Sequence, residues 1–252
     1  MVWLVDRPIL FFCVTLVLLW GAAELGVLVR FRVHKLTPAE RSEFDLVRNA
    51  MFTLLGLIVG FAISMAVSRY DLRKTYEEAE ANAVGTEYLR LELMPPEIAA
   101  AARALLKTYA EERVAFYKER DPERQSRNEA ETALTQNALW RAIAPEAKTA
   151  QTPINALVAS GMNDVLNSQG YTLAAWRNRL PSEVWLLLIV VAAASSFLIG
   201  FGAERLSPVT HAVLPLTAAL AFLLIADVEG PHNGLIRVEP VNLEDALAAM
   251  RK

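Results

Sequence analysis

Cysteine is almost absent from this chain of 252 residues, which contains only Cys13. A single cysteine excludes a disulfide framework within the chain and any metal site built mainly from cysteines. Cys13 lies inside an apolar run. A free cysteine in such a run usually acts as a small apolar side chain that contacts lipid or a neighbouring helix.

Motifs of catalysis are lacking as well. The three histidines, His34, His211 and His232, are far apart, and none has the spacing of an HExxH zinc motif. The sequence contains no phosphate-binding loop, dinucleotide-binding glycine pattern or nucleophile elbow. We therefore expect no enzyme, no cofactor and no metal. The net charge of -3 does not indicate a nucleic-acid partner.

Apolar sequence is abundant: 54% of the residues are hydrophobic, while 21% are charged. This mixture predicts apolar membrane spans alternating with a polar domain. Four stretches have the length of a bilayer span, about 20 residues each: 8–29, 47–67, 182–201 and 208–226. Arg7 is the only basic residue before the first stretch, and no good cleavage site follows the stretch. A membrane span is therefore favoured over a secretory signal.

Strand signals are absent, so we predict an all-α membrane protein with four transmembrane helices and a soluble helical bundle. No proline interrupts the chain between Ala39 and Met94, which predicts one long helix, or two with a slight bend. Thr37 and Glu40 fit a capping box at its start. Further helices are expected at 97–120, 129–143, 153–180 and 243–250, with a polar turn at 121–128.

The expected organisation has four parts. They are a first transmembrane hairpin (1–67), a soluble helical domain (68–180), a second transmembrane hairpin (181–226) and a C-terminal tail (227–252). Lysine and arginine are almost equally frequent beside the two ends of the spans. The small difference favours cytoplasmic termini and a cytoplasmic central domain.

The second span has a thin face and a bulky face. On a helical wheel stepped at about 100° per residue, Gly60 and Ser64 fall within about 80° of Gly56. Such a stripe of small residues lets two helices approach closely in lipid. The bulky face, about 140° to 200° from Gly56 on the same wheel, consists of four large residues: Leu54, Ile58, Phe61 and Met65.

Two interpretations of these faces are open. In the first, the thin face packs on another span and the bulky face contacts lipid, as in many membrane helices. In the second, several copies of the chain place Ile58, Phe61 and Met65 around a shared axis. These side chains would then form an apolar constriction that gates by dewetting.

A charged segment continues the second span. Arg69 and Arg73 lie at the membrane edge, where basic side chains commonly reach the interface. Glu77, Glu80 and Glu87 follow, within about 80° of one another on the wheel. In one copy they would form a solvated face. Around an axis they would form carboxylate rings that favour cations in a vestibule, while the basic cluster equally favours anions.

The stretch LLGLIVGFAISMAVSRYDLRKTYEEAEANAVG, residues 54–85, resembles the segment of bestrophins and their bacterial relatives that forms the pore neck and continues into the cytosol. The shared features are Leu-Leu-Gly-Leu, then Gly60-Phe61, then Ser-Arg-Tyr-Asp at 68–71, and an acidic, alanine-rich helix. The chain is most similar to a bacterial family named for a bestrophin-like domain. That resemblance covers most of 52–237, including EANAVGTEYLR and GLIRV.

Bestrophins are homopentameric ion channels, many of them anion-selective, with some bacterial members that prefer cations. The resemblance implies a multi-pass protein of the bacterial inner membrane whose partners are the lipid bilayer, copies of itself and inorganic ions. It implies a pore neck at Ile58, Phe61 and Met65. The chain differs from bestrophins in lacking the tryptophans that follow the arginine and an evident acidic calcium clasp in the tail.

Three functional hypotheses follow. The first is a homo-oligomeric, pentameric ion channel whose pore runs along the second span. The second is a non-conducting membrane anchor that presents a helical bundle to a cytoplasmic partner, and it predicts a monomer, a dimer or a closed centre. The third is a membrane enzyme, which requires a polar cluster that only the folded structure reveals.

Overall fold

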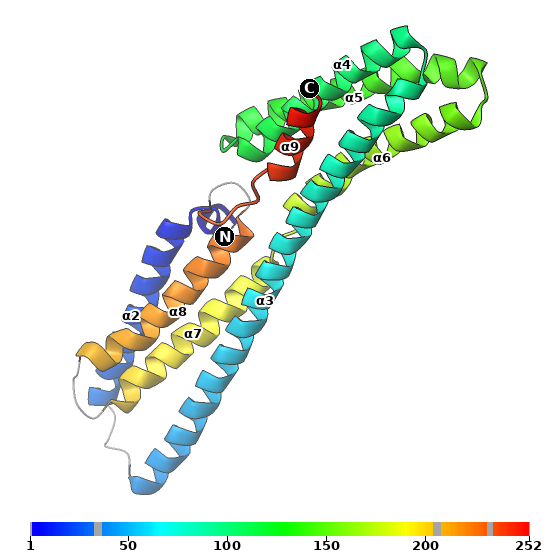
Figure 1. Ribbon diagram of the computed structural model, residues 1–252. Helices are drawn as coiled ribbons and strands as arrows, with labels where there is room; N and C mark the ends of the chain where they lie inside the picture. Colours follow the sequence, from blue (N-terminus) through cyan, green and yellow to red (C-terminus); the bar gives the residue numbers. More distant parts are fainter. Residues whose placement is uncertain (1, 33–36, 204–207, 231–233, 252) are drawn as a thin grey trace. The chain divides into compact units, whose positions relative to one another are not determined.

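The computed structural model describes residues 2–32, 37–203, 208–230 and 234–251 (Figure 1). Regular structure in these ranges consists of α-helices and one short 3-10 helix, without a strand, which confirms the predicted all-α fold. Four helical segments among the described residues are long and apolar enough to cross a membrane.

Two compact units make up the chain. Unit 1 comprises Met1–Arg69 and Arg179–Arg237, and unit 2 comprises Tyr70–Asn178 and Val238–Lys252. The long helix α3, Pro38–Arg90, contributes its first part to unit 1 and its last part to unit 2. The C-terminal tail is likewise divided between the two units.

Unit 1 contains the apolar helices. The short α1 (Val2–Val5) precedes α2 (Pro8–Arg32), and α2 packs along α7 (Ser182–Gly202) and α8 (Pro208–Glu229). The first part of α3 completes the unit. These bounds contain all four predicted spans.

The ring of Phe11 joins three helices of unit 1. This α2 side chain is fully buried, with its ring centroid 5.1 Å from that of Trp185 on α7, edge to face. The Phe222 ring of α8 lies 6.5 Å away in a stacked arrangement. Aromatic pairs of this kind contribute about 1 kcal/mol each beyond the burial of their surface.

Two glycines bring the backbones of α2 and α7 together. A Cβ atom at Gly26 would lie 2.1 Å from the carbonyl oxygen of Phe197, and one at Gly200 would lie 1.8 Å from that of Ala23. No real side chain tolerates such contacts, so only glycine permits this approach. Close backbone packing through small residues is the usual way in which helices associate in lipid.

Unit 2 is a helical bundle. Its helices are the last part of α3, the 3-10 helix η1 (Leu91–Leu93), α4 (Pro96–Lys118), α5 (Pro122–Thr149), α6 (Pro153–Arg177) and α9 (Val241–Ala249). Helix α4 packs on α5 and α9, and α5 packs on α6. The core combines fully buried side chains from four helices: Val84, Leu106, Tyr109, Leu139, Ile143 and Met162.

The start of α3 has the predicted capping box. The backbone N–H of Thr37 donates to Glu40 Oε2 at 2.7 Å, and the backbone N–H of Glu40 donates to Thr37 Oγ1 at 3.4 Å. The helix continues without interruption to Arg90. The prediction of a single long helix is therefore confirmed, and the alternative of two helices is wrong.

The predicted polar turn at 121–128 is wrong, because α5 begins at Pro122. Asp121 caps the helix by accepting a hydrogen bond from the backbone N–H of Glu123 at 2.9 Å. Proline at the first helical position, preceded by a capping aspartate, is a common helix start. This local pattern outweighs the polar composition that favoured a turn.

Replacing Gly200 by alanine is expected to destabilise unit 1, because the new methyl group overlaps the Ala23 carbonyl and the two backbones must separate. We expect a loss of about 1–3 kcal/mol. The midpoint of thermal unfolding in detergent should fall by about 2–4 °C for each kcal/mol lost. Gly21→Ala is the matched control, since nothing lies within 4 Å of its Cβ position. Equal midpoints for the two variants would contradict the close approach of α2 and α7.

Candidate functional site

The predicted site residues all lie on α3, and the structure divides this helix into a buried face and two open faces. In the span, the buried face consists of Leu55, Ala62 and Ala66, about 240° to 280° from Gly56 on the wheel. The same face continues beyond the span with buried residues of a different kind: Arg73, Glu77, Glu80, Val84, Glu87 and Leu91. On the wheel, the residues of α3 that are buried in unit 1 and those that are buried in unit 2 therefore lie on the same side of the helix.

The bulky face of the span is open in the single chain. The side chain of Phe61 is 61% exposed and that of Met65 is 38% exposed, while Ile58 is partly buried. All three lie on the side of α3 next to the buried face rather than on it. Their large apolar surface is available to lipid or to another copy.

The thin face is open as well. Gly56, Gly60 and Ser64 are exposed, and nothing lies within 4 Å of the Cβ positions of the two glycines. The small-residue stripe is thus not used for packing within the chain. In this it differs from Gly26 and Gly200, which the fold of unit 1 requires.

Arg69, at the end of the span, is held by a buried carboxylate. Its Nη1 atom lies 2.9 Å from Oε1 of Glu229, the last residue of α8, whose side chain is only 3% exposed. The other oxygen of Glu229 accepts the backbone N–H of Leu180 at 2.8 Å. One carboxylate thus connects α3, α8 and the segment that precedes α7.

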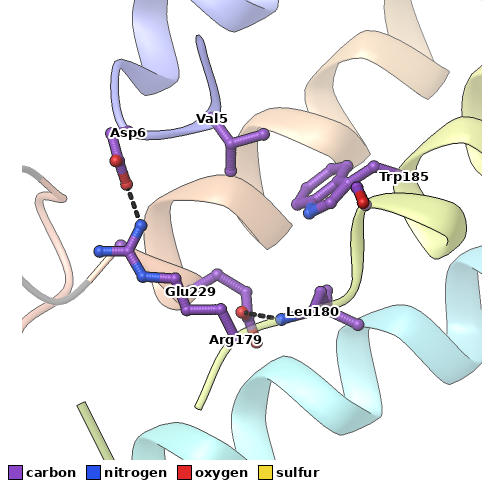
Figure 2. A pocket seen from close by; sticks show the side chains of 8 residues that line it. Val5, Asp6, Arg179, Leu180, Trp185 and Glu229 are labelled. Atoms are coloured by element: carbon purple, nitrogen blue, oxygen red, sulfur yellow. Dashed lines mark hydrogen bonds and ion pairs between the residues drawn. The ribbon is translucent and has the colours of Figure 1, made fainter. Parts of the chain in front are cut away.

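Figure 2 shows this carboxylate beside a small cavity in unit 1. The cavity has a volume of about 30 Å³, and its lining includes Val5, Trp185 and Glu229. Two further lining residues, Asp6 and Arg179, form an ion pair with each other. Because the space suits about one water molecule, we interpret the cluster as a structural anchor rather than a ligand site.

A second carboxylate near the end of α8 shapes the tail. The Oδ1 atom of Asp227 accepts the backbone N–H of Leu235 at 2.7 Å, and its Oδ2 atom accepts that of Ile236 at 2.9 Å. Asp227 is buried, so these two donors replace the water that it loses. The start of the GLIRV segment is thereby fixed against α8.

Glu77, in unit 2, attaches α9 to α3. Its buried carboxylate accepts the Asn242 side-chain amide at 2.6 Å and the backbone N–H of Leu243 at 3.0 Å. Both donors lie in the first turn of α9. A negative charge is favourable there, because free N–H groups and the helix dipole both point toward it.

Glu80 and Arg113 form the central ion pair of unit 2, and neither side chain is exposed. Arg113 of α4 donates through Nε to Oε1 and through Nη2 to Oε2, the second bond being 3.3 Å long. The Tyr109 hydroxyl donates to Oε1 at 3.0 Å, and Thr172 of α6 donates to Oε2 at 3.2 Å. The guanidinium carbon of Arg113 lies 4.4 Å from the centre of the Phe116 ring.

The buried pair shifts the pKa values of its neighbours, all of which lie outside the membrane-spanning segments. Burial and the adjacent Glu80 carboxylate raise the pKa of Tyr109 and of Tyr117 well above the ordinary tyrosine value. Burial by itself would lower the pKa of Arg113, but the Glu80 carboxylate outweighs it and raises the pKa. The cluster is therefore one carboxylate and one guanidinium among neutral hydroxyls.

Glu87 is buried as well, but its carboxylate oxygens have no hydrogen-bond partner among the described residues. The nearest cation is Arg90, with Nη1 3.9 Å from Glu87 Oε2. Burial raises the pKa of Glu87 to about 8. At neutral pH the side chain is mainly a neutral acid.

The expectation that Glu77, Glu80 and Glu87 form a solvated face is wrong, because all three are buried. Their shared position on the wheel is the position of the helix face that packs inward. Arg73 is buried on the same face. The assignment of these residues and Arg69 to a vestibule concerns an assembly of copies and stays a prediction, as does the assignment of the neck residues.

Sequence reasoning missed four residues that organise the site: Arg113, Glu229, Asp227 and Asn242. Arg113 had a usable signal, because it lies on the apolar stripe of α4 between Tyr109 and Phe116. A charge in such a position indicates a buried partner. The other three residues act on backbone groups or at helix ends, and no pattern in the sequence marks them.

No group of three or more histidine, cysteine, aspartate or glutamate side chains suited to a metal ion occurs in the part of the chain that the structure describes. The site is instead a set of ion pairs and hydrogen bonds along the inward face of α3. In unit 1 these bonds fix α3 to α8, and in unit 2 they fix it to α4, α6 and α9.

The fold and this site define a multi-pass, all-α membrane protein. The profile of the Bestrophin-like domain family matches residues 17–243. The chain belongs to this family, which confirms the resemblance found in the sequence. No curated protein matches the chain.

Solved structures show the same fold. A bacterial bestrophin homologue from Klebsiella pneumoniae has a TM-score of 0.67 at 17% identity, over 94% of this chain and 97% of the homologue. A single-residue variant of the Klebsiella pneumoniae homologue has a TM-score of 0.61 at 19% identity, over 96% and 98% of the two chains. The fold of this chain is therefore bestrophin-like over nearly its whole length.

Replacing Arg113 by methionine should strongly destabilise unit 2, because Glu80 would be left buried without its counter-charge. Removing one partner of a buried ion pair costs about 3–5 kcal/mol. Denaturant unfolding of the purified chain, followed by tryptophan fluorescence, measures the loss.

A double variant with methionine at both Glu80 and Arg113 should lose less than the sum of the two single losses, because no charge remains buried alone. Glu78→Gln is the control, since Glu78 is an exposed glutamate on the same helix. Losses that simply add would show that the two side chains do not interact.

Proposed function

We propose that the chain assembles into a homopentamer in the inner membrane of a bacterium and conducts ions along α3. The observation that carries the proposal is the open bulky face of the second span, on a helix whose adjacent face is fully packed. Membership in the Bestrophin-like domain family and the bestrophin-like fold support it. The proposal requires neither a cofactor nor covalent chemistry.

The low burial of α3 in its own chain supports assembly with further copies. Within its most apolar window, 17% of the residues of the α3 segment are buried, compared with 39% for the segment that contains α7 and 50% for the α8 segment. Lipid can cover any apolar surface, but its contact with α3 is not improved by the small residues Gly56, Gly60 and Ser64. A neighbouring helix gains close backbone contact there.

The two open faces of α3 suit two different surroundings in a ring. Their centres differ by about 130° on the helical wheel. The thin face would pack on the neighbouring copy, and the bulky face would point to the common axis. Ile58, Phe61 and Met65 of each copy would then form an apolar neck that controls conduction by wetting and dewetting.

The buried charges of α3 take a supporting role in this proposal. They would hold α3 in position from its packed face and would not contact the ions in the vestibule. These residues are Arg69, Arg73, Glu77, Glu80 and Glu87. Of the exposed polar residues of α3 beyond the span, Ser68 and Thr86 lie nearest the direction of the bulky face, about 120° from Gly56 on the wheel, and would line the vestibule.

The orientation belongs to the same proposal. The slight excess of lysine and arginine beside one set of span ends supports cytoplasmic termini and a cytoplasmic unit 2. Ions would then pass from the neck into a cytoplasmic vestibule formed by the last part of α3.

Phe61→Ala is expected to increase the unitary current several-fold, because a smaller side chain widens the neck and makes it easier to wet. Single-channel recording in planar bilayers measures the current. Leu186→Ala is the matched control, since Leu186 is a similarly exposed apolar residue on α7. An equal change in both variants would reject Phe61 as a neck residue.

Oligomer mass and conductance test the proposal as a whole. Mass measurement in detergent should give five copies, and the intact protein should carry current across a range of salts and pH. A monomer, or a pentamer without any current, would reject the channel. The non-conducting membrane anchor would then be the better description.

A further inference from the structure

Glu87 differs from the other two glutamates on the inward face of α3. The carboxylates of Glu77 and Glu80 each accept at least two hydrogen bonds, whereas neither oxygen of Glu87 has a donor among the described residues. Its side chain is nevertheless fully buried. An ionised carboxylate in such a position is very unfavourable, because it has lost its water without gaining donors.

Gly161 of α6 explains how the carboxyl group became enclosed. A Cβ atom at this position would lie 1.9 Å from Glu87 Oε2 and 2.4 Å from Arg90 Nη1. The carboxyl group therefore rests on the bare backbone of α6. It occupies the space that the side chain of any residue other than glycine would fill at position 161. Val84 on α3, Leu91 on η1 and Met162 on α6 belong to the apolar cluster at this contact.

Two charged groups act on Glu87, one from each helix. Arg90, on α3, favours the ionised form, but its 3.9 Å separation is too long for a hydrogen bond. Asp164, on α6, favours the protonated form. Burial, assisted by Asp164, outweighs Arg90 and raises the pKa of Glu87 to about 8.

We propose that Glu87 is a proton-binding site at the contact between α3 and α6. With its proton bound, the neutral acid packs on the Gly161 backbone and the two helices stay closed. When the proton leaves to solvent, the carboxylate must be hydrated or paired with Arg90, and the contact around Gly161 loosens. The site takes a proton and no larger ligand.

The direction of the pH effect follows from linkage. The pKa of Glu87 is higher in the folded chain than the ordinary value of 4.5. The folded chain therefore retains a proton that the unfolded chain releases, and the contact loses stability as pH rises from about 4.5 to about 8. In the proposed channel α3 lines the pore, so conduction would also depend on this proton, and this last step rests on the proposed function.

Hydrogen–deuterium exchange of the intact chain in detergent tests the site, with peptides that cover the α6 segment around Gly161. At pH 9 about nine-tenths of Glu87 is ionised, so these peptides should exchange several-fold faster in the native protein than in Glu87→Gln. At pH 6 the two proteins should exchange alike. Each comparison is made at a single pH, so the intrinsic pH dependence of exchange cancels.

Infrared titration provides a second measurement that does not depend on the Glu87→Gln variant folding. A carboxylic-acid carbonyl band should lose half its intensity near pH 8. In Gly161→Ala the new methyl group pushes the carboxyl group toward water, and the midpoint should fall by at least about one pH unit. Glu78→Gln, which alters an exposed glutamate, should leave the band unchanged.

Absence of a carboxyl band above pH 6, or equal exchange of the native protein and Glu87→Gln at pH 9, would overturn the proposal. Neither measurement needs an ionic current. A protein that conducts without this pH response would reject the proton site alone, and a protein with the response but without current would reject the channel alone.

Discussion

The buried ion pair between Glu80 and Arg113 is the interaction on which the rest of unit 2 depends. It lies where α3, α4 and α6 meet, and Tyr109 and Thr172 complete the hydrogen bonds of its carboxylate. A pair of this kind adds little net stability compared with apolar side chains, but it strongly disfavours every arrangement that separates the two charges. We therefore infer that the main effect of the ion pair is to fix the orientation of α3 about its own axis within the bundle.

The orientation of α3 about its own axis matters because its first part packs among the apolar helices of unit 1 and its last part packs in the helical bundle of unit 2. In the span, the packed face is made of Leu55, Ala62 and Ala66, and at its end the bond between Arg69 and Glu229 of α8 fixes the orientation of α3 within unit 1. Beyond the span, the same face includes the charged residues Glu77 and Glu80, whose partners on α9 and α4 allow one orientation of α3 within unit 2.

Much of this architecture is predictable from the sequence, and the limits have physical causes. The spans, the unbroken α3 and its capping box follow from local apolar runs, proline positions and the spacing of Thr37 and Glu40. The wheel also groups Glu77, Glu80 and Glu87 correctly on one face. It does not show that this face is inward, because the partner Arg113 lies on another helix. Acceptors such as Asp227 and Glu229 bind backbone N–H groups, which carry no sequence signal.

Three glutamates on one face therefore have three different surroundings, and the difference explains how a rigid helix can still respond to its conditions. Glu77 receives donors from the first turn of α9, and Glu80 receives a guanidinium and the hydroxyls of Tyr109, Tyr117 and Thr172. Glu87 meets only the backbone at Gly161 and a distant Arg90. The hydrogen bonds of the first two hold α3 in place within unit 2. At Glu87, as proposed, adding or removing a single proton changes how tightly α3 is held against α6, without breaking the bonds of Glu77 and Glu80.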